Sequence, residues 1–194
     1  MELLLDLNKR YTFADYLTWI DDKRRELYEG FIKIMSPAPA RKHQQISVFL
    51  VQQIGSYLHH QKCKMFHAPF DVRLPKNGEK DDSKIYTVVQ PDICIICDPS
   101  KLDEKGCLGA PDMIIEIVSP SSSHNDVNEK FNIYQQAGVS EYWIVFPNEK
   151  VISVFILNNG KYENQGMYAP GDIVSPKVFN GLLLLNVDDM FADD

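Results

Sequence analysis

Hydrophobic positions change their spacing along the first third of the chain, and these changes predict a helix, a strand and a longer helix. Thr12-Phe-Ala-Asp15 has the pattern of a capping box, and apolar residues at helical spacing follow it. Glu26 to Met35 predicts a strand interrupted by Gly30, and Ser36-Pro-Ala-Pro39 ends it. A longer helix is then predicted from about Ala40 to His60, with these core candidates: Ile46, Phe49, Leu50 and Leu58.

Beyond this helix the apolar spacing becomes that of β-strands. Phe66 to Leu74 alternates loosely, and Thr87 to Cys97 is rich in residues that favour strands. Asp112 to Val118 is a short apolar run typical of a central strand. A loop over Asp98 to Pro111, which contains two glycines and two prolines, is expected between the last two strands.

A helix and a hairpin are predicted after the central strand. The helix runs from about Asn125 to Ala137, and Gly138 suits its C-terminal end. Glu141 to Phe146 then reads as a strand, Val151 to Leu157 returns as the second arm of a hairpin, and Asn158-Asn-Gly160 turns the chain again. Strand, helix and strand form a βαβ unit, so its two strands should be parallel with the helix packed over the sheet.

Length and composition indicate one ordinary globular domain. The chain has 194 residues, of which 44% are hydrophobic and 24% charged. We expect a single domain over residues 1–194, with a core at about 11–157 and a C-terminal β extension at 158–194. No secretory signal and no apolar run of about 18 residues is present, which predicts a cytoplasmic protein without membrane contact.

The formal net charge is −7, so nucleic-acid binding cannot be inferred from charge. Local basic patches can still coexist with an acidic total. The candidates, each of which also reads as ordinary solvated surface, are Lys9-Arg10, Lys23-Arg24-Arg25 and Arg41-Lys42.

Four cysteines include a C-x-x-C pair, Cys94 and Cys97, which raises zinc or redox chemistry as a possibility. The pair lies in a strand-like run, where side chains three positions apart point to opposite faces and cannot share a metal. We therefore expect Cys63, Cys94, Cys97 and Cys107 to be buried free thiols.

Two carboxylates, Asp92 and Glu116, interrupt apolar strand faces, where a charge is costly unless it is paired or bound to a metal. If their strands are neighbours, the two can converge on one divalent cation, with Mg²⁺ the best match. A structural charge with hydrogen-bonded neighbours is the alternative for each residue taken singly.

Lys130 lies within the apolar arc of the predicted helix, among residues such as Val127, Phe131 and Tyr134. A sheet-facing lysine is unusual because buried lysines need partners. The alternatives are an ion pair with Asp126 one turn away or a snorkelling side chain. If Lys130 meets the two carboxylates, the three groups favour metal-dependent phosphodiester hydrolysis.

Pro91-Asp92, Glu116-Ile-Val118 and Lys130, in this order, resemble the PD-(D/E)XK nuclease superfamily and, more narrowly, the Uma2 family of restriction-endonuclease-like proteins. The resemblance runs from about Tyr11 to Phe155. It implies an α/β (α+β) restriction-endonuclease-like fold, in which helices flank a mixed β-sheet. It also implies Asp92, Glu116 and the backbone carbonyl of Ile117 as metal ligands.

The chain departs from the superfamily pattern at Val118, which stands where the motif has its lysine, so Lys130 would supply the ammonium from the helix. Phe31 stands where the family often has an acidic residue. Glu29 or Glu26 is expected as an auxiliary carboxylate, with a slight preference for Glu29. His43 matches a family histidine and is a candidate for phosphate contact or proton transfer, with an exposed surface position as the alternative.

The leading hypothesis from the sequence is a Mg²⁺- or Mn²⁺-dependent DNA endonuclease that acts as a homodimer, with the hairpin from Val151 to Tyr162 as a contact surface. The rival hypothesis is a nuclease fold that binds nucleic acid or a protein without cutting. A zinc or thiol-redox protein is a weaker third. We expect the remaining histidines to be structural or solvated: His59, His60, His67 and His124.

Overall fold

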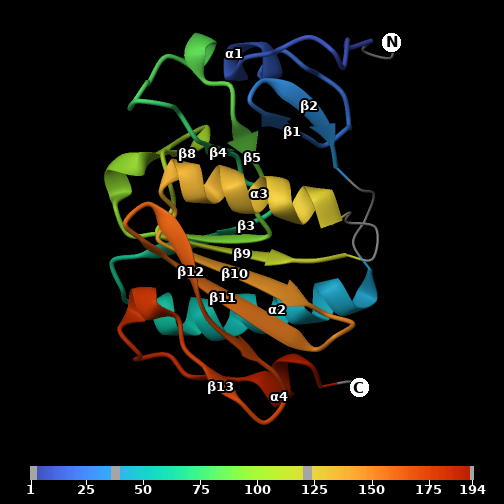
Figure 1. Cartoon of the computed structure of the whole chain (residues 1–194). Helices are drawn as coiled ribbons and strands as arrows, with labels where there is room; N and C mark the ends of the chain where they lie inside the picture. Colours follow the sequence, from blue (N-terminus) through green and yellow to red (C-terminus); the bar gives the residue numbers. More distant parts are fainter. Residues whose placement is uncertain (1–3, 36–39, 120–123, 193–194) are drawn as a thin grey trace.

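The computed structural model describes residues 4–35, 40–119 and 124–192, except for the side chains of residues 124–126. A six-stranded mixed sheet forms its centre, in the order β12-β11-β10-β9-β6-β3 (Figure 1). Its strands are β3 (Lys64–His67), β6 (Ile93–Ile96), β9 (Met113–Ile117), β10 (Glu141–Phe146), β11 (Val151–Asn158) and β12 (Lys161–Tyr168).

The predicted βαβ unit is confirmed. β9 and β10 are parallel neighbours, and α3 (His124–Ala137) connects them and covers the sheet. Gly138 ends this helix with φ at +89°. The predicted hairpin is also confirmed, since β11 pairs antiparallel with β10 and then turns into β12.

A second six-stranded sheet lies on the α3 side of the molecule, in the order β2-β1-β5-β4-β8-β7. The segment that we expected to be one interrupted strand is a hairpin within this sheet. Glu29 and Gly30 both have positive φ, at +51° and +94°, which is the conformation of a tight two-residue turn. The strands are β1 (Arg25–Tyr28), β2 (Phe31–Ile34), β4 (Val72–Arg73), β5 (Val88–Val89), β7 (Leu102–Asp103) and β8 (Gly106–Leu108).

The expected loop over Asp98 to Pro111 is therefore only partly a loop, because β7 and β8 lie within it. Gly106 begins β8 with φ at +113°, and a Cβ atom there would lie 2.2 Å from the carbonyl oxygen of Asp71. The close approach allows the amide of Cys107 to donate to that oxygen at 2.9 Å. Glycine is thus required where the second sheet packs its strands together.

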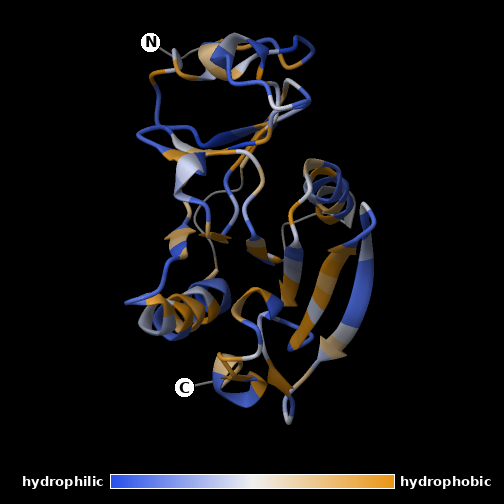
Figure 2. Cartoon of the chain, turned by 90° about the vertical axis from the view of Figure 1, so that its left-hand side faces the viewer, coloured by the Kyte–Doolittle hydropathy of each residue, from blue (hydrophilic) through white to orange (hydrophobic). Residues whose placement is uncertain are grey.

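Two helices cover opposite faces of the central sheet (Figure 2). The longer helix, α2 (Arg41–Leu58), presents Ile46, Leu50, Ile54 and Leu58 to one face, as the apolar spacing predicts, although Phe49 is only half-buried. Tyr134 of α3 packs on the other face together with residues of the second sheet. Odd- and even-numbered residues of β9 thereby enter two different cores.

The ends of the chain pack at the edges of these layers. The predicted capping box of Thr12 and Asp15 begins α1 (Phe13–Tyr16). Beyond β12 the C-terminal segment forms a two-stranded sheet and a short helix, and this helix contacts α2. These elements are β13 (Ile173–Val174), β14 (Leu185–Asn186) and α4 (Val187–Met190), and single 3-10 turns occur at Asp82–Lys84, Pro99–Lys101 and Lys177–Phe179.

The expectation of four free thiols is wrong for two of the cysteines. Cys63 and Cys97 form a disulfide, because the antiparallel register of β3 and β6 places them opposite each other. Cys94 and Cys107 are buried and free, as predicted. Cys94 and Cys97 do face opposite sides of the sheet, since they belong to different cores.

No described helix combines the length and the apolar character that crossing a membrane requires.

Candidate functional site

Asp92 and Glu116 come together because β6 and β9 are neighbouring strands, the condition on which their predicted convergence depended. Ile93 of β6 pairs with Ile115 of β9 in antiparallel register, so Asp92, just before β6, lies level with Glu116. The amide of Ile117 donates to Oδ2 of Asp92 at 2.8 Å, which brings the main chain of Ile117 beside this carboxylate. The three expected ligand positions therefore lie in one place.

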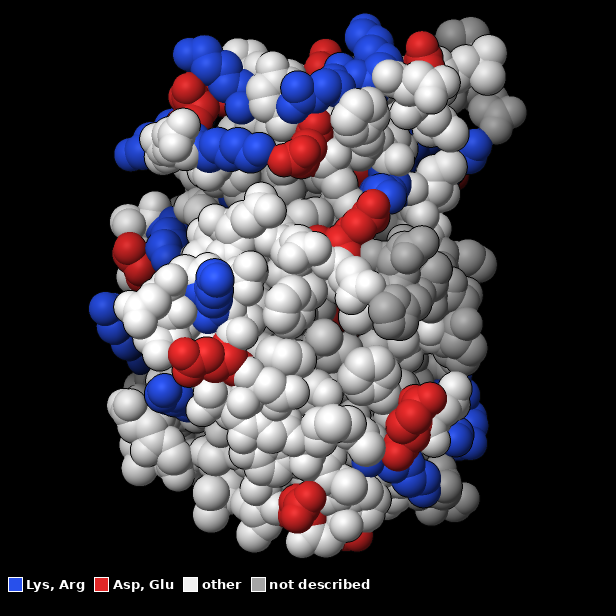
Figure 3. Space-filling model, in the orientation of Figure 1, with Lys and Arg blue, Asp and Glu red and all other residues white. Residues whose placement is uncertain are grey.

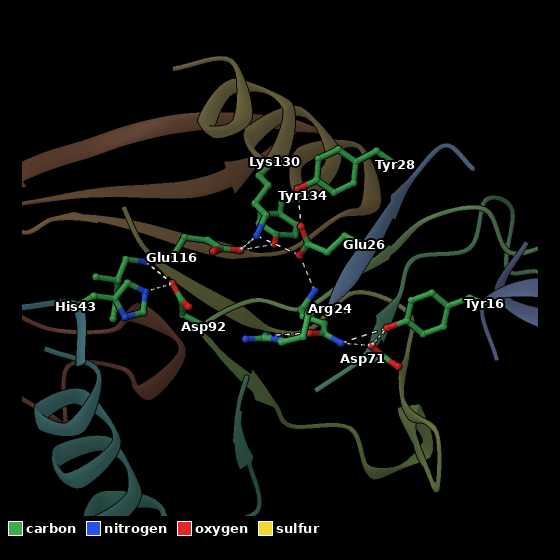
Figure 4. Close-up of polar contacts among 12 residues, drawn as sticks. Tyr16, Arg24, Glu26, Tyr28, His43, Asp71, Asp92, Glu116, Lys130 and Tyr134 are labelled. Atoms are coloured by element: carbon green, nitrogen blue, oxygen red, sulfur yellow. Dashed lines mark hydrogen bonds and ion pairs between the residues drawn. The ribbon is translucent and has the colours of Figure 1, made fainter. Parts of the chain in front are cut away.

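Lys130 joins this pair from α3 (Figure 4). Its Nζ atom donates to Oε1 of Glu116 at 2.9 Å, and Tyr134, one turn further along the helix, donates to the same oxygen at 2.6 Å. Neither the lysine nor the tyrosine is a surface group, since Tyr134 is fully buried and the Lys130 side chain is 15% exposed. The predicted sheet-facing position of Lys130 is confirmed, and its described partners are carboxylates of the two sheets.

The second sheet contributes the third carboxylate, Glu26 of β1. Its Oε1 atom lies 3.2 Å from Nζ of Lys130 and accepts the amide of Gln90 at 2.7 Å. Its other oxygen accepts the hydroxyl of Tyr28 at 2.8 Å. The preference for Glu29 is not supported by this geometry, because Glu29 lies in the exposed turn and pairs with Lys76.

The charges of this cluster are strongly coupled. Burial raises the pKa of Glu116 to about 7, against the opposing effect of the Lys130 ammonium. Burial lowers the pKa of Lys130, but the carboxylates of Glu116 and Glu26 outweigh it and hold that pKa well above its ordinary range. Lys130 is therefore a fixed positive charge between two acidic side chains.

His43 approaches the cluster from the first turn of α2. Its Nε2 atom lies 3.2 Å from Oδ2 of Asp92, and among the described residues its buried Nδ1 atom has no hydrogen-bond partner. Burial lowers the pKa of His43, but the hydrogen bond and charge of Asp92 outweigh it and raise that pKa. The predicted alternative of an exposed surface histidine does not hold, since His43 is buried.

Gln90, which sequence reasoning missed as a site residue, connects the cluster to a second polar network. Its side chain accepts from Arg24 at 2.9 Å and donates to Asp71 at 2.9 Å and to Tyr16 at 3.2 Å. Burial raises the pKa of Asp71. Gln90 could have been found from its place immediately before Pro91-Asp92. Tyr28 could have been found because it lies two positions after Glu26 in a strand, and Tyr134 because it lies four positions after Lys130 in a helix.

Apart from Arg24, which bonds to Gln90, the other sequence candidates have no described contact with the cluster. Arg25 is buried and bonded to Asp21, so it cannot serve a basic patch. His59, His60 and His67 are exposed. The side chains of Asp126 and His124 lie outside the described part of the chain, and with them the suggested ion pair of Lys130 to Asp126.

The donor chemistry of the cluster fits a divalent cation such as Mg²⁺. The described contacts of the two strand carboxylates use Oδ2 of Asp92 and Oε1 of Glu116, so Oδ1 and Oε2 are the oxygens that could accept a metal. No group of three or more His, Cys, Asp or Glu side chains suited to a metal occurs among the described residues. Two carboxylates and a backbone carbonyl, completed by water and phosphate, suit Mg²⁺, which retains several waters.

Comparison with known proteins places this geometry in context. Residues 13–188 match the Uma2 family, whose description is "Putative restriction endonuclease". Over 148 residues the chain is 24% identical to an uncharacterised protein of Synechocystis. This aligned region covers 75% of this chain and 73% of that protein. A crystal structure of a "putative nuclease belonging to DUF820" from Anabaena variabilis has the same fold. Its TM-score is 0.72 at 24% identity, with 93% of this chain and 97% of that chain covered.

Proposed function

Because the chain belongs to the Uma2 family, we propose that it is a metal-dependent DNA endonuclease that hydrolyses phosphodiester bonds. One observation carries the proposal. The ammonium of Lys130 lies between Glu116 and Glu26, and Asp92 stands level with Glu116 on the next strand. An acidic pair with a fixed cation beside it is a set of groups that supports metal-dependent phosphoryl chemistry.

In the proposed mechanism Asp92, Glu116 and the carbonyl of Ile117 would hold Mg²⁺ or Mn²⁺. A cation held there would act as a Lewis acid toward the scissile phosphate and would lower the pKa of a water molecule. Lys130 stabilises negative charge that develops on the phosphate. Glu26 restricts the position of the Lys130 ammonium, and Tyr134 restricts the position of the Glu116 carboxylate.

His43 and the Gln90 network are positioning groups in this mechanism. His43 contacts Oδ2 of Asp92, which leaves Oδ1 of the same carboxylate for the metal. The amide of Gln90 fixes Glu26, and its side chain ties the site to Asp71. Such contacts orient ligand carboxylates before substrate arrives.

We further propose that the enzyme acts on duplex DNA as a homodimer, since cutting both strands requires two sites. The hairpin of β11 and β12 was the expected contact surface. Its residues Phe155 and Tyr162 partly pack on Phe131 of α3 within the chain, whereas Met167 of β12 is 67% exposed. Light scattering on the purified protein, with Met167→Lys as a disrupting variant, tests this assembly.

Cleavage assays test the proposed activity directly. Supercoiled plasmid, single-stranded DNA and structured DNA are incubated with Mg²⁺, Mn²⁺ or EDTA, and the wild type is compared with Lys130→Ala. We expect metal-dependent nicking that disappears in the variant and that persists in Lys84→Ala, whose lysine is 62% exposed and pairs with Glu79 and Asp81 instead of a carboxylate of the cluster. Equal cleavage by wild type and Lys130→Ala would refute the assigned role.

A second candidate function is binding of nucleic acid or a protein partner without cutting. It is favoured by the placement of Val118, where the superfamily has its lysine, and by the use of Lys130 as a partner for two carboxylates. Tight DNA binding by folded wild type, with no cleavage of any of these substrates in either metal, would support this alternative.

A further inference from the structure

A cavity of about 920 Å³ opens between the β1–β2 hairpin, the segment 74–78 and α3. Figure 1 shows the elements that line it, with α3 running below β1 and β2. A pocket of this size is within the range of small-molecule sites. None of the groups assigned to phosphate chemistry above, Asp92, Glu116 or Lys130, lines it.

The cavity nevertheless adjoins the candidate active site. Tyr28 lines the cavity, and its hydroxyl donates to Glu26, the partner of Lys130. On α3, Lys130 and Tyr134 face the carboxylates, whereas Glu129 and Ile133 line the cavity. Tyr28 and α3 therefore lie between the cavity and the candidate active site and contact both.

The lining combines an exposed aromatic ring with amide side chains. Phe31 is 43% exposed at the hairpin, immediately after the turn at Gly30. Asn77, Asn132 and Gln136 line the same cavity. An amide side chain carries both a hydrogen-bond donor and an acceptor, so it can pair with the donors and acceptors on the edge of a nucleobase. An aromatic ring can stack on the face of the same base.

The charges of the lining are balanced. Lys33 pairs with Glu129 at 2.7 Å across the cavity, between β2 and α3, and Lys76 pairs with Glu29 at 2.7 Å. Because each lysine is already paired with a carboxylate, the lining offers a phosphate no net positive charge, whereas a neutral base needs none. Figure 3 shows that charged side chains gather over the upper sheet, whereas the centre of the face below it is largely uncharged.

We propose that this cavity binds one nucleobase, unpaired or flipped out of its duplex, from the nucleic-acid strand whose phosphate lies at the Asp92–Glu116–Lys130 cluster. The base stacks on Phe31 and its edge is bonded by Asn132 and neighbouring amides. The inference rests on the proposed function for the identity of the polymer. It adds a specificity-determining subsite, so that the choice of cleavage position depends on one base as well as on metal chemistry.

The test uses a fluorescein-labelled single-stranded DNA of 12 nucleotides, bound in EDTA so that nothing is cut. In a series of oligonucleotides each position in turn is made abasic, and affinity is measured by fluorescence anisotropy. Loss of one stacked base is expected to weaken wild-type binding about 5- to 150-fold at one position. The same abasic substitution should cause no further loss in Phe31→Ala, because the stacking partner is already absent.

Asn132→Ala provides a second variant, at an exposed position of the helix. The control is Ile173→Ala, which should keep wild-type affinity because it removes a 60% exposed side chain from β13. The proposal is overturned if wild type does not bind the oligonucleotide, if all abasic positions bind alike, or if the abasic loss is unchanged in Phe31→Ala. Cleavage of the same oligonucleotide in Mg²⁺ is scored separately. If the oligonucleotide is cleaved but Phe31→Ala has no effect, only the proposed base subsite is refuted. If the abasic effect depends on position but no cleavage occurs, only the proposed endonuclease activity is refuted.

Discussion

Replacing Lys130 with methionine separates its electrostatic role from its packing. The substitution keeps an unbranched side chain but removes the ammonium from between Glu116 and Glu26. The three side chains are only 15%, 13% and 4% exposed, so water cannot replace the lost partner. Breaking a buried ion pair costs about 3–5 kcal/mol. We expect the lower end, about 3 kcal/mol, because Tyr134 and Tyr28 still donate to the two carboxylates.

Urea unfolding in EDTA measures this cost without interference from bound metal. The matched control is Lys84→Met, which breaks an ion pair between Lys84 and Glu79 whose lysine is 62% exposed. Exposed pairs contribute about 0–1 kcal/mol, so the control should be close to wild type. On the folded protein, plasmid nicking should fall by about 10²–10³-fold in Lys130→Met, the size of effect seen when one charge-stabilising donor is removed.

A double variant then decides between a structural and a chemical role. Adding Glu26→Gln to Lys130→Met removes one of the stranded charges, so part of the lost stability should return. Nicking should not return, because no ammonium faces the phosphate. If activity recovers together with stability, Lys130 serves only to hold the fold, and the reasoning is refuted.

Three further predictions concern positions around the site and in the scaffold. His43→Ala should lower the kcat for cleavage about 10- to 100-fold with little change in KM, because Asp92 loses an orienting contact; an unchanged kcat would remove His43 from the site. Burial raises the pKa of Glu141 above its ordinary 4.5, so the folded chain holds this proton more tightly than the unfolded chain. Its contribution to stability should therefore fall as the pH rises from about 4.5 through the raised pKa, and Glu141→Gln should flatten that part of a plot of Tm against pH. Gly106→Ala places a Cβ 2.2 Å from a carbonyl oxygen and should cost at least about 2 kcal/mol in urea unfolding, whereas Gly160→Ala, with open space around it, should cost about 1 kcal/mol; equal costs would contradict the steric argument.

The β9–α3–β10 unit was predicted best because it is determined by residues that lie close together in the sequence. Apolar runs and the glycine after α3 mark the β9–α3–β10 unit, and a crossover of this length makes its strands parallel. The same local patterns predicted Asp92 and Glu116 on strand faces and Lys130 on the sheet side of the helix. Whether β6 and β9 are neighbours is a matter of topology, and only the structure settles that the residues meet.

The errors arise where pairing between distant segments decides the outcome. Cys63 and Cys97 are 34 residues apart, and only the register of β3 with β6 shows that they face each other. The β1–β2 hairpin was misread because a glycine in an apolar run fits an interrupted strand as well as a turn. With the turn placed at Glu29 and Gly30, alternation along β1 puts Glu26 and Tyr28 on one face, and the choice between Glu26 and Glu29 follows.

Glu141 shows why a carboxylate in a strand does not by itself identify a site. It lies in β10, next to the strand of Glu116, and is only 2% exposed. Its oxygens accept the indole N–H of Trp143 at 2.8 Å and the amides of Lys177 and Val178 at 3.0 and 2.9 Å, so both are occupied by fixed donors that tie the C-terminal segment to the sheet. Glu116 instead bonds a lysine and a tyrosine through one oxygen and stands level with a second acid. Two buried glutamates in adjacent strands therefore differ in their proposed roles because their partners differ. Those partners are set by the packing of the helix and of the chain end, which no local pattern of residues predicts.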